Sequence, residues 1–450
     1  MAKLQLRASY GWLLSAVVLI YGSFNLARWN KQDVLKHDMF VYYSYLPATF
    51  IYQDLDFTFY QNLQAQGEKG EFWTLTAPNG KPVQKMSMGV AYCYVPFFLL
   101  GHAAAEIGPW EANGYTVPYH FSIAMAGLFY SLLGLFIAKK IVLKYVSESS
   151  AFYTVLALGL GTNLFYYSTS EAGMSHAFSF ALIASFIWLT MKWWSNANVK
   201  NSILIGLISG LIVLIRPTNL LLAVPFLVYG EHLKQGLKQT LSYVLAHKVQ
   251  VTILVICALA IWIPQLLYWK SQTGNWWYYS YQGESFFWGD SRILQGLFSY
   301  RKGWLIYTPV MVLALLGLVL LISKQNPWKW ALIIWLPIQL YITYSWWCWW
   351  YGGSFGQRVM IDFYALLAIP LALFIQYILQ KKRKGIATLL VFMFVSFNLF
   401  QTFQYRKTLI HWDSMTKAAY WAVFLKTNFP ENYGELIETP DYEEAKKGQR

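Results

Sequence analysis

Apolar runs of about 20 residues recur along this chain, and short clusters of lysine separate them. A run of this length crosses the hydrocarbon core of a bilayer as an α-helix. Helices are predicted because a spanning segment must pair all of its backbone polar groups internally. Only 12% of the residues are charged, against roughly 25% in soluble domains, and 57% are hydrophobic. The sequence therefore predicts an all-α polytopic membrane protein.

Basic residues collect in the cytoplasmic loops of membrane proteins, so the lysine clusters predict the direction of each helix. The clusters are Lys139/Lys140/Lys144, Lys192/Lys200, Lys234/Lys238/Lys248, Lys324/Lys329 and 381–384. Placing all of them on one side predicts about 11 spans. The predicted spans are residues 10–27, 118–138, 150–168, 174–191, 202–216, 218–230, 249–269, 304–323, 330–346, 359–379 and 386–404. We expect residues 1–404 to form one transmembrane domain and residues 405–450 a short periplasmic tail.

In this topology residues 28–117 form a long first outer loop. Within it, the run 88–105 is apolar enough to span the membrane. If it did, the next run would end with Lys139 and Lys140 on the outer side, so we place 88–105 in the interface as a juxtamembrane helix. Residues 40–60 are expected to lie in the interface in the same way. The first apolar run follows two basic residues and is interpreted as a retained signal anchor.

Composition also limits the partners. The formal net charge of +14 raises the question of a nucleic-acid partner. Because the lysines and arginines fall between apolar runs, as they do in cytoplasmic loops, we expect no nucleic acid. Aromatic residues make up 19% of the chain, which is typical of belts at the two membrane interfaces. The three cysteines are isolated in apolar or aromatic runs, which argues against paired-cysteine chemistry.

Asp38 lies in HDMFVYYSYLP, just after the exit of the first predicted span. A carboxylate in this place can accept the proton of an attacking hydroxyl or amine at the membrane surface. An aspartate before an aromatic-rich run is also a good N-cap for a helix. Both interpretations, a catalytic base and a helix cap, stand at this stage. Asp54 and Asp56 fit the capping role better.

Lys85, Arg216 and Arg358 are cations at the predicted outer ends of apolar segments. Arg216 precedes a helix-breaking proline, and an arginine at the centre of a span costs about 2.5–3.5 kcal/mol. It therefore needs an interface, a lipid phosphate or an acidic partner. Arg358 follows a glycine pair and offers a planar fork to a phosphate. The alternative for Lys85 and Arg358 is a long side chain that reaches from an apolar surface to the interface.

Glu171 and His176 occupy the short predicted loop STSEAGMSH between two spans. Together with Asp38 they offer carboxylate and imidazole groups, which bind divalent metals such as Mg or Mn. No spacing motif accompanies these residues. The alternative is that His176 donates a hydrogen bond to a phosphate.

Several short segments together resemble bacterial integral-membrane glycosyltransferases of the GT-C superfold, which include protein mannosyltransferases and aminoarabinose transferases. The segments are the acid of the first outer loop, KMSMGVAYCYVPFFLLGH, the second outer loop with MSH, LIRPTN, SYRKGWLIYTPV and WWYGGSFGQR. They are spread from residue 10 to about residue 380. The second outer loop departs from the pattern, because it lacks the acidic pair of the clearest metal-dependent members.

The resemblance implies transfer of a sugar from a polyprenyl-phosphate carrier to a lipid, glycan or protein acceptor. By position Asp38 matches the base of the family. The residues expected to hold the donor phosphate are Lys85, His176, Arg216 and Arg358. A single attack at the anomeric carbon would invert its configuration. The expected location is the cytoplasmic (inner) membrane, with the active site facing the periplasm.

Two other classes of function remain open. A flippase or polymerase of lipid-linked saccharides would share the basic outer surface without needing Asp38 as a base. A non-catalytic membrane subunit of a surface assembly would tolerate alanine at Asp38, Arg216 and Arg358 together. The enzymatic interpretation differs from both, because it requires these residues to converge on one site.

Overall fold

The computed structural model describes residues 6–65, 74–230 and 237–450, so Lys234 of the predicted basic clusters lies outside the described residues. The helices before residue 231 are α1 (Ala8–Leu26), α2 (Asp38–Phe50), α3 (Phe59–Ala65), α4 (Gly89–Ile107), α5 (Val117–Val142), α6 (Glu148–Leu160), α7 (Leu164–Thr169), α8 (Ser175–Ser195), α9 (Val199–Ile215) and α10 (Ala223–Val228). The later helices are α11 (Leu237–Ala246), α12 (Lys248–Ala260), α13 (Ile263–Thr273), α14 (Ile293–Phe298), α15 (Trp304–Tyr307), α16 (Met311–Ser323), α17 (Lys329–Ser345), α18 (Tyr364–Gln380), α19 (Lys384–Arg406), α20 (Lys417–Val423), α21 (Tyr433–Leu436) and α22 (Tyr442–Lys446).

Short 3₁₀ helices and one hairpin complete the described chain. The 3₁₀ helices are η1 (Arg28–Lys31), η2 (Pro217–Leu222) and η4 (Arg358–Phe363). Strands β1 (Thr74–Thr76) and β2 (Pro82–Gln84) pair antiparallel, with Leu75 opposite Val83. Nearly all residues of α18 are buried, and it packs against α5, α6, α8 and α16, so it forms the core of the bundle.

Six helices of the described chain are long and apolar enough to cross a membrane, or up to seven if the bent pair Lys238–Ala246 and Lys248–Ala260 is one span. They are Ala8–Lys31, Gly89–Ile107, Val117–Val142, Ser175–Ser195, Arg358–Gln380 and Lys384–Arg406. This confirms an all-α protein with several membrane-compatible helices, whereas the count of about 11 spans is not confirmed.

Breaks and short helices account for much of this difference. The predicted span 150–168 is divided between α6 and α7, and 304–323 is divided between α15 and α16 at Pro309. Proline favours such a break, because it lacks the backbone N–H and its ring clashes with the preceding turn. The run 88–105 forms α4, which meets the length and composition of a span. Its position in the interface stays a prediction.

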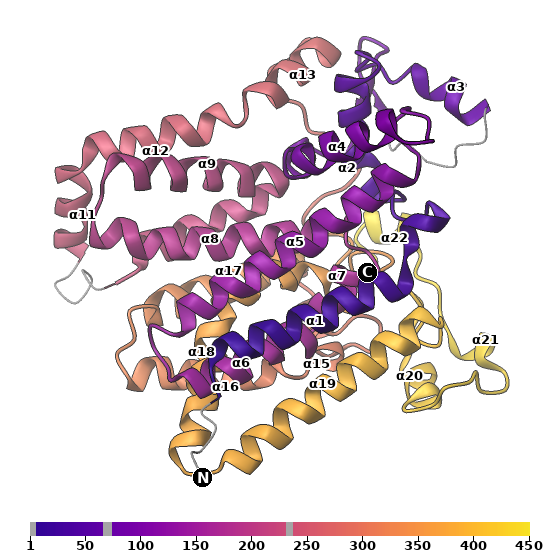
Figure 1. The fold of residues 1–450 in the computed structure, drawn as a ribbon. Helices are drawn as coiled ribbons and strands as arrows, with labels where there is room; N and C mark the ends of the chain where they lie inside the picture. Colours follow the sequence, from indigo (N-terminus) through magenta and orange to yellow (C-terminus); the bar gives the residue numbers. More distant parts are fainter. Residues whose placement is uncertain (1–5, 66–73, 231–236) are drawn as a thin grey trace.

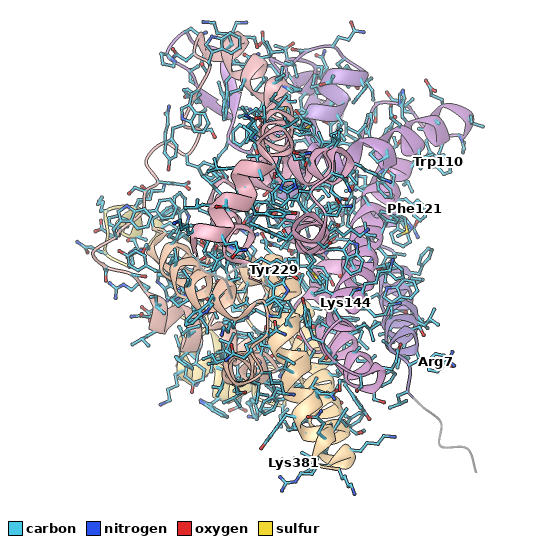
Figure 2. All side chains as sticks on the ribbon, turned by 90° about the vertical axis from the view of Figure 1, so that its left-hand side faces the viewer. Arg7, Trp110, Phe121, Lys144, Tyr229 and Lys381 are labelled. Carbon is cyan, nitrogen blue, oxygen red and sulfur yellow. The ribbon has the colours of Figure 1, made fainter. Side chains whose placement is uncertain are left out.

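Basic residues from several helices meet at one end of the bundle. The Nζ atoms of Lys144 and Lys192 lie 5.7 and 5.4 Å from the ring centroid of Trp188. At the same end the indole N–H of Trp328 donates to the Tyr145 hydroxyl at 3.0 Å. Figure 2 faces this end and labels the basic residues Arg7, Lys144 and Lys381. The helices therefore bring basic clusters from distant parts of the chain to one side.

The opposite end carries the first loop and the C-terminal segment (Figure 1). Helix α2 is buried over almost its whole length and packs against α4. The aromatic side chains of α2 are enclosed by protein, and the interfacial position of residues 40–60 stays a prediction. Helix α2 also ends at Phe50, and α3 begins only at Phe59.

The C-terminal segment packs onto the neighbouring loops. The Tyr442 hydroxyl donates to Asp413 at 2.9 Å. Arg450 donates from Nη1 to the carbonyl oxygens of Ser345 and Trp346, at 3.2 and 2.8 Å. Residues 405–450 thus brace the loop after α17.

One glycine sets the distance between α5 and the segment that leads into α8. A Cβ atom on Gly127 would lie 1.6 Å from the carbonyl oxygen of Ala172 and 2.4 Å from its carbonyl carbon. Small residues let backbones approach closely in membrane proteins. Because the blocking atoms belong to the backbone, a side chain here would displace the segment before α8.

We therefore expect Gly127→Ala to destabilise the protein, since overpacking of this kind costs about 1–3 kcal/mol. The measurement is the midpoint of thermal unfolding in detergent. Gly385→Ala is the matched control, because a Cβ at Gly385 would meet no heavy atom within 4 Å. Equal midpoints for the two variants would contradict the close approach at Gly127.

Candidate functional site

Asp38 is placed by a loop that α5 holds. The Nδ1 atom of His120 accepts hydrogen bonds from the N–H groups of Val34 and Leu35, both at 3.2 Å. His37 then adopts φ 50° and ψ −133°, a conformation that L-residues rarely adopt. Such strain persists only where the surroundings enforce it, and it is common at functional sites.

The Asp38 side chain does not cap a helix. It is the first residue of α2, the N-cap position belongs to His37, and no side-chain cap bond is formed. Its carboxylate instead pairs with Arg358, with Oδ2 3.0 Å from Nη1. The capping interpretation of Asp38 is therefore wrong, whereas Asp54 does cap α3 by accepting from the N–H of Phe59 at 3.0 Å.

Arg358 opens η4, and the loop before it is fixed through its backbone. Asn163 Nδ2 donates to the carbonyl oxygen of Phe355 at 3.1 Å, and the Phe355 N–H donates to the Tyr167 hydroxyl at 3.0 Å. The Lys302 ammonium contacts the carbonyl oxygens of Ser354 and Trp412. Arg358 therefore follows a loop whose backbone is held by several hydrogen bonds.

A second group of charges lies beside this pair. The Nδ1–H of His176, in the first turn of α8, donates to Asp362 Oδ1 at 2.8 Å. Asp362 Oδ2 lies 3.5 Å from Arg216 Nε, just after the end of α9. Arg216 Nη2 is 3.4 Å from His176 Nε2 and 3.3 Å from Ser175 Oγ. Because a carboxylate only accepts, Asp362 fixes the His176 tautomer that leaves Nε2 as an acceptor toward Arg216.

Tyr42 of α2 joins the two groups. Burial raises the pKa of its hydroxyl and the Asp38 charge raises it further, whereas Arg216 and Arg358 lower it. The charges of Asp38, Arg216 and Arg358 all act on the Tyr42 hydroxyl, which places it close to both groups. We call Asp38, His176, Arg216, Arg358 and Asp362 the Asp38 cluster.

The cluster is open on its arginine side. The side chains of Arg216 and Arg358 keep 23% and 16% of their surface exposed, whereas Asp362 keeps 1%. In the described part of the chain, neither arginine Nε has a hydrogen-bond acceptor within bonding geometry. Both Nε atoms are buried, so an anion would reach the exposed parts of the two arginine side chains, and paired guanidinium groups are suited to an anion with several oxygens, such as a phosphate.

Lys85 lies next to the cluster in a separate ion pair. It pairs with Glu284, and its Nζ sits 5.3 Å from the ring centroid of Tyr281. Burial raises the pKa of Tyr281, on which Asp38 and Arg216 also act. Lys85 is therefore a neighbour of the cluster, and a phosphate would have to compete with Glu284 for its charge.

The predicted metal site is not formed by the described residues. Among them, no group of three or more His, Cys, Asp or Glu side chains is placed to hold a metal ion. Glu171 accepts from the Tyr166 hydroxyl at 2.9 Å, the ring nitrogens of His176 contact Asp362 and Arg216, and Asp38 pairs with an arginine. The two arginines would also repel a divalent cation.

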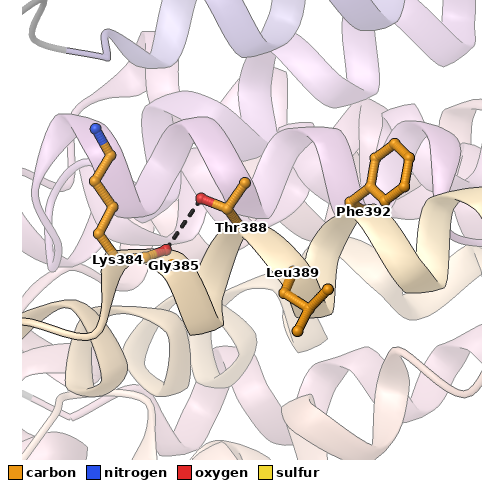
Figure 3. A pocket seen from close by; sticks show the side chains of 5 residues that line it. All are labelled: Lys384, Gly385, Thr388, Leu389 and Phe392. Atoms are coloured by element: carbon orange, nitrogen blue, oxygen red, sulfur yellow. Dashed lines mark hydrogen bonds between the residues drawn. The ribbon is translucent and has the colours of Figure 1, made fainter.

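A depression on α19 is a poor alternative to this site. Figure 3 shows it, lined by Lys384, Gly385, Thr388, Leu389 and Phe392. The Thr388 hydroxyl is used within the helix, where it donates to the Lys384 carbonyl oxygen at 3.0 Å. With one lysine and no acidic group, this surface offers no acid–base chemistry.

Comparison with known proteins gives no independent indication of family. A scan against models of protein families finds no match to this chain, and no curated protein matches it significantly.

Sequence reasoning did not single out Asp362 or Tyr42. Asp362 sits in the apolar run VMIDFYALLAIP, and an acid inside such a run is expensive unless it has a partner. The free-energy cost of an acid in an apolar run is therefore the sequence feature by which Asp362 could have been identified. Tyr42 is one of many tyrosines in the first loop, and only its position distinguishes it.

Lys302 is a buried cation outside the cluster. It is 1% exposed, and burial lowers the pKa of its amine to about 7. Asp413 opposes this shift, and Arg358 adds to it. In the unfolded chain the amine keeps its ordinary pKa, 10.5. Between these two values the unfolded chain binds more protons, so the free energy of unfolding rises with pH.

We therefore expect Lys302→Met to flatten the pH dependence of stability between pH about 7 and about 10. The measurement is the thermal unfolding midpoint in detergent as a function of pH. Lys270→Met, at an exposed lysine of α13, is the control and should follow the unmodified protein. Parallel curves for Lys302→Met and the unmodified protein would contradict a neutral buried amine.

Proposed function

We propose that the Asp38 cluster transfers a sugar from a polyprenyl-phosphate carrier to an acceptor at the outer face of the membrane. The observation that carries the proposal is the meeting of one carboxylate and two arginines from distant segments, with Asp38 Oδ2 3.0 Å from Arg358 Nη1. A glycosyl transfer of this kind needs a base for the acceptor and cations for the departing phosphate.

Each residue has a distinct role in this proposal. Asp38 takes the proton from the acceptor oxygen or nitrogen as that atom attacks the anomeric carbon. The bond from this carbon to the phosphate oxygen breaks, and the polyprenyl phosphate leaves with the electron pair. Arg216 and Arg358 stabilise the charge that grows on the phosphate, which is usually the largest contribution to catalysis. One displacement at the anomeric carbon inverts its configuration.

His176 and Asp362 support Arg216 in this mechanism. The ion pair to Asp362 and the contact with His176 Nε2 hold the guanidinium in one orientation. Lys85 adds positive potential from the side, while Glu284 neutralises part of it. The proposal needs no metal, because the two guanidinium groups supply the positive charge.

The cluster also separates this proposal from the other two classes. A flippase or polymerase would use the arginines without a base, and a structural subunit would use neither. Asp38 is buried beside Arg358, whose side chain keeps 16% of its surface exposed, and this placement of a carboxylate next to a partly accessible cation favours a reacting centre over a purely structural ion pair.

We expect Asp38→Asn to lower transfer by about 10²–10⁴-fold, the usual contribution of a general base. The assay is release of polyprenyl phosphate from a panel of synthetic polyprenyl-phosphate hexoses and pentoses, with a membrane extract as acceptor. Asp33→Asn is the control, because Asp33 pairs with Arg28 and Lys36 outside the cluster. Transfer within a few-fold of normal in a folded Asp38→Asn protein would refute the assignment.

Asp362→Asn tests whether this buried acid positions Arg216. Without its ion pair to Asp362, Arg216 is expected to lose a charged hydrogen bond to the donor phosphate, which costs about 1.5–3 kcal/mol and corresponds to about 10- to 100-fold in donor affinity. We expect the KM for the donor to rise by this factor while kcat changes less. Glu443→Gln, at an exposed acid of α22, is the control. A uniform loss of folded protein with normal KM would instead indicate a structural role.

A further inference from the structure

A second group of cations lies where α1, α7 and α19 come together. Arg406, the last residue of α19, donates from Nε to Ser170 Oγ at 2.8 Å and from Nη2 to Thr169 Oγ1 at 2.7 Å. Arg28, just after α1, donates from Nη1 to the carbonyl oxygen of Ser170 at 2.5 Å. We call Arg28, Thr169, Ser170 and Arg406 the Arg406 cluster.

The charges of this cluster are not balanced. Arg28 pairs with Asp33, and the same carboxylate pairs with Lys36 at 3.0 Å. Within the described chain, Arg406 has no acidic side chain within 4.0 Å. Arg28 and Lys36 therefore share one acid, and Arg406 has none among the described residues. The excess positive charge is a feature that an anion would neutralise.

The hydroxyl groups add a second observation that points to an anion. Ser170 Oγ accepts from Arg406, and in the described residues its own hydrogen has no acceptor within bonding distance. Thr169 uses its hydrogen within α7, where it donates to Phe165 at 2.8 Å. The Ser170 hydroxyl hydrogen and Arg406 Nη1, which has no hydrogen bond among the described residues, are thus donors available to a phosphate. The cavity beside Arg28, Thr169 and Ser170 is too small for a phosphate and is not lined by Arg406, which is exposed, so the phosphate would lie on the outer side of Arg406.

The surroundings of the cluster are apolar and exposed. Helix α7 contacts α1 on one side, where Thr169 faces Gly22, and α19 on the other, where Arg406 lies over the ring of Phe165. In Figure 1, α1 and α19 run in a similar direction and both end on this side of the bundle. Tyr21 and Phe24 of α1 keep 70% and 50% of their surface exposed. A ligand here would meet a charged site and an apolar surface at once.

We propose that the Arg406 cluster binds the phosphate of an anionic phospholipid, at a site distinct from the Asp38 cluster. The phosphate accepts hydrogen bonds from Arg406 and Ser170, and Arg28 supplies further charge. The acyl chains lie along the exposed rings of α1. A basic site bordered by apolar surface fits an anionic headgroup better than a soluble anion, because both parts of the ligand are matched.

The test compares lipid binding by the full chain and by Arg406→Gln. Purified protein is delipidated in a neutral detergent and titrated with phosphatidylglycerol, and bound lipid is counted by native mass spectrometry. We expect the variant to lose at least about tenfold in affinity at one site, since an arginine–phosphate pair is worth a charge-assisted hydrogen bond or more. Arg292→Gln, at an arginine paired with Asp290, is the control and should bind normally.

A second variant and a competing anion provide two further tests of the proposal. Ser170→Ala should lower lipid affinity at the same site while keeping the fold. It replaces Arg406→Gln as the test variant if Arg406→Gln does not fold. Inorganic phosphate is titrated in parallel. Equal lipid binding by all variants would overturn the site, and displacement of the lipid by an equal concentration of inorganic phosphate would overturn its assignment to a lipid.

Discussion

A charge that leaves water is costly unless an opposite charge accompanies it, and this constraint shapes the whole functional end of the protein. The Asp38 cluster meets it with two acids and two arginines that come from three separate segments. Each charged side chain is paired with a residue of another segment. The cluster therefore exists only when the first loop, the end of α9 and η4 are all in place, which ties its geometry to the fold.

The surrounding structure serves to keep those segments in register. His120 holds the loop before Asp38, and Lys302 holds the loop before Arg358. Gly127 admits the segment that leads to His176. Each support is a buried backbone contact, so it fixes a side chain without touching it. The rigidity that general-base chemistry demands is thus built from polar contacts outside the reacting groups.

The sequence was informative where one residue type has a strong physical preference. Arg216 was identified because an arginine beside a helix-breaking proline needs a partner, and the structure supplies Asp362. The number of spans was less predictable, because apolar runs such as 150–168 divide into short helices whose breaks depend on packing. The arrangement around the predicted metal ligands was also hard to predict, for a related reason. Sequence reveals which ligand types are present, but not that arginines occupy the places beside Asp38 and His176.

The neutrality of the cluster has a consequence for the order of events. With Arg358 on Asp38 and Arg216 on Asp362, each carboxylate is matched by one guanidinium. An arriving phosphate competes with Asp38 for Arg358, whereas Asp362 is buried and retains its own pairing. Under the proposed function, donor binding releases the carboxylate that must act as base. Asp38 then meets an acceptor only after the phosphate is held, which protects the sugar from transfer to water before both substrates are bound.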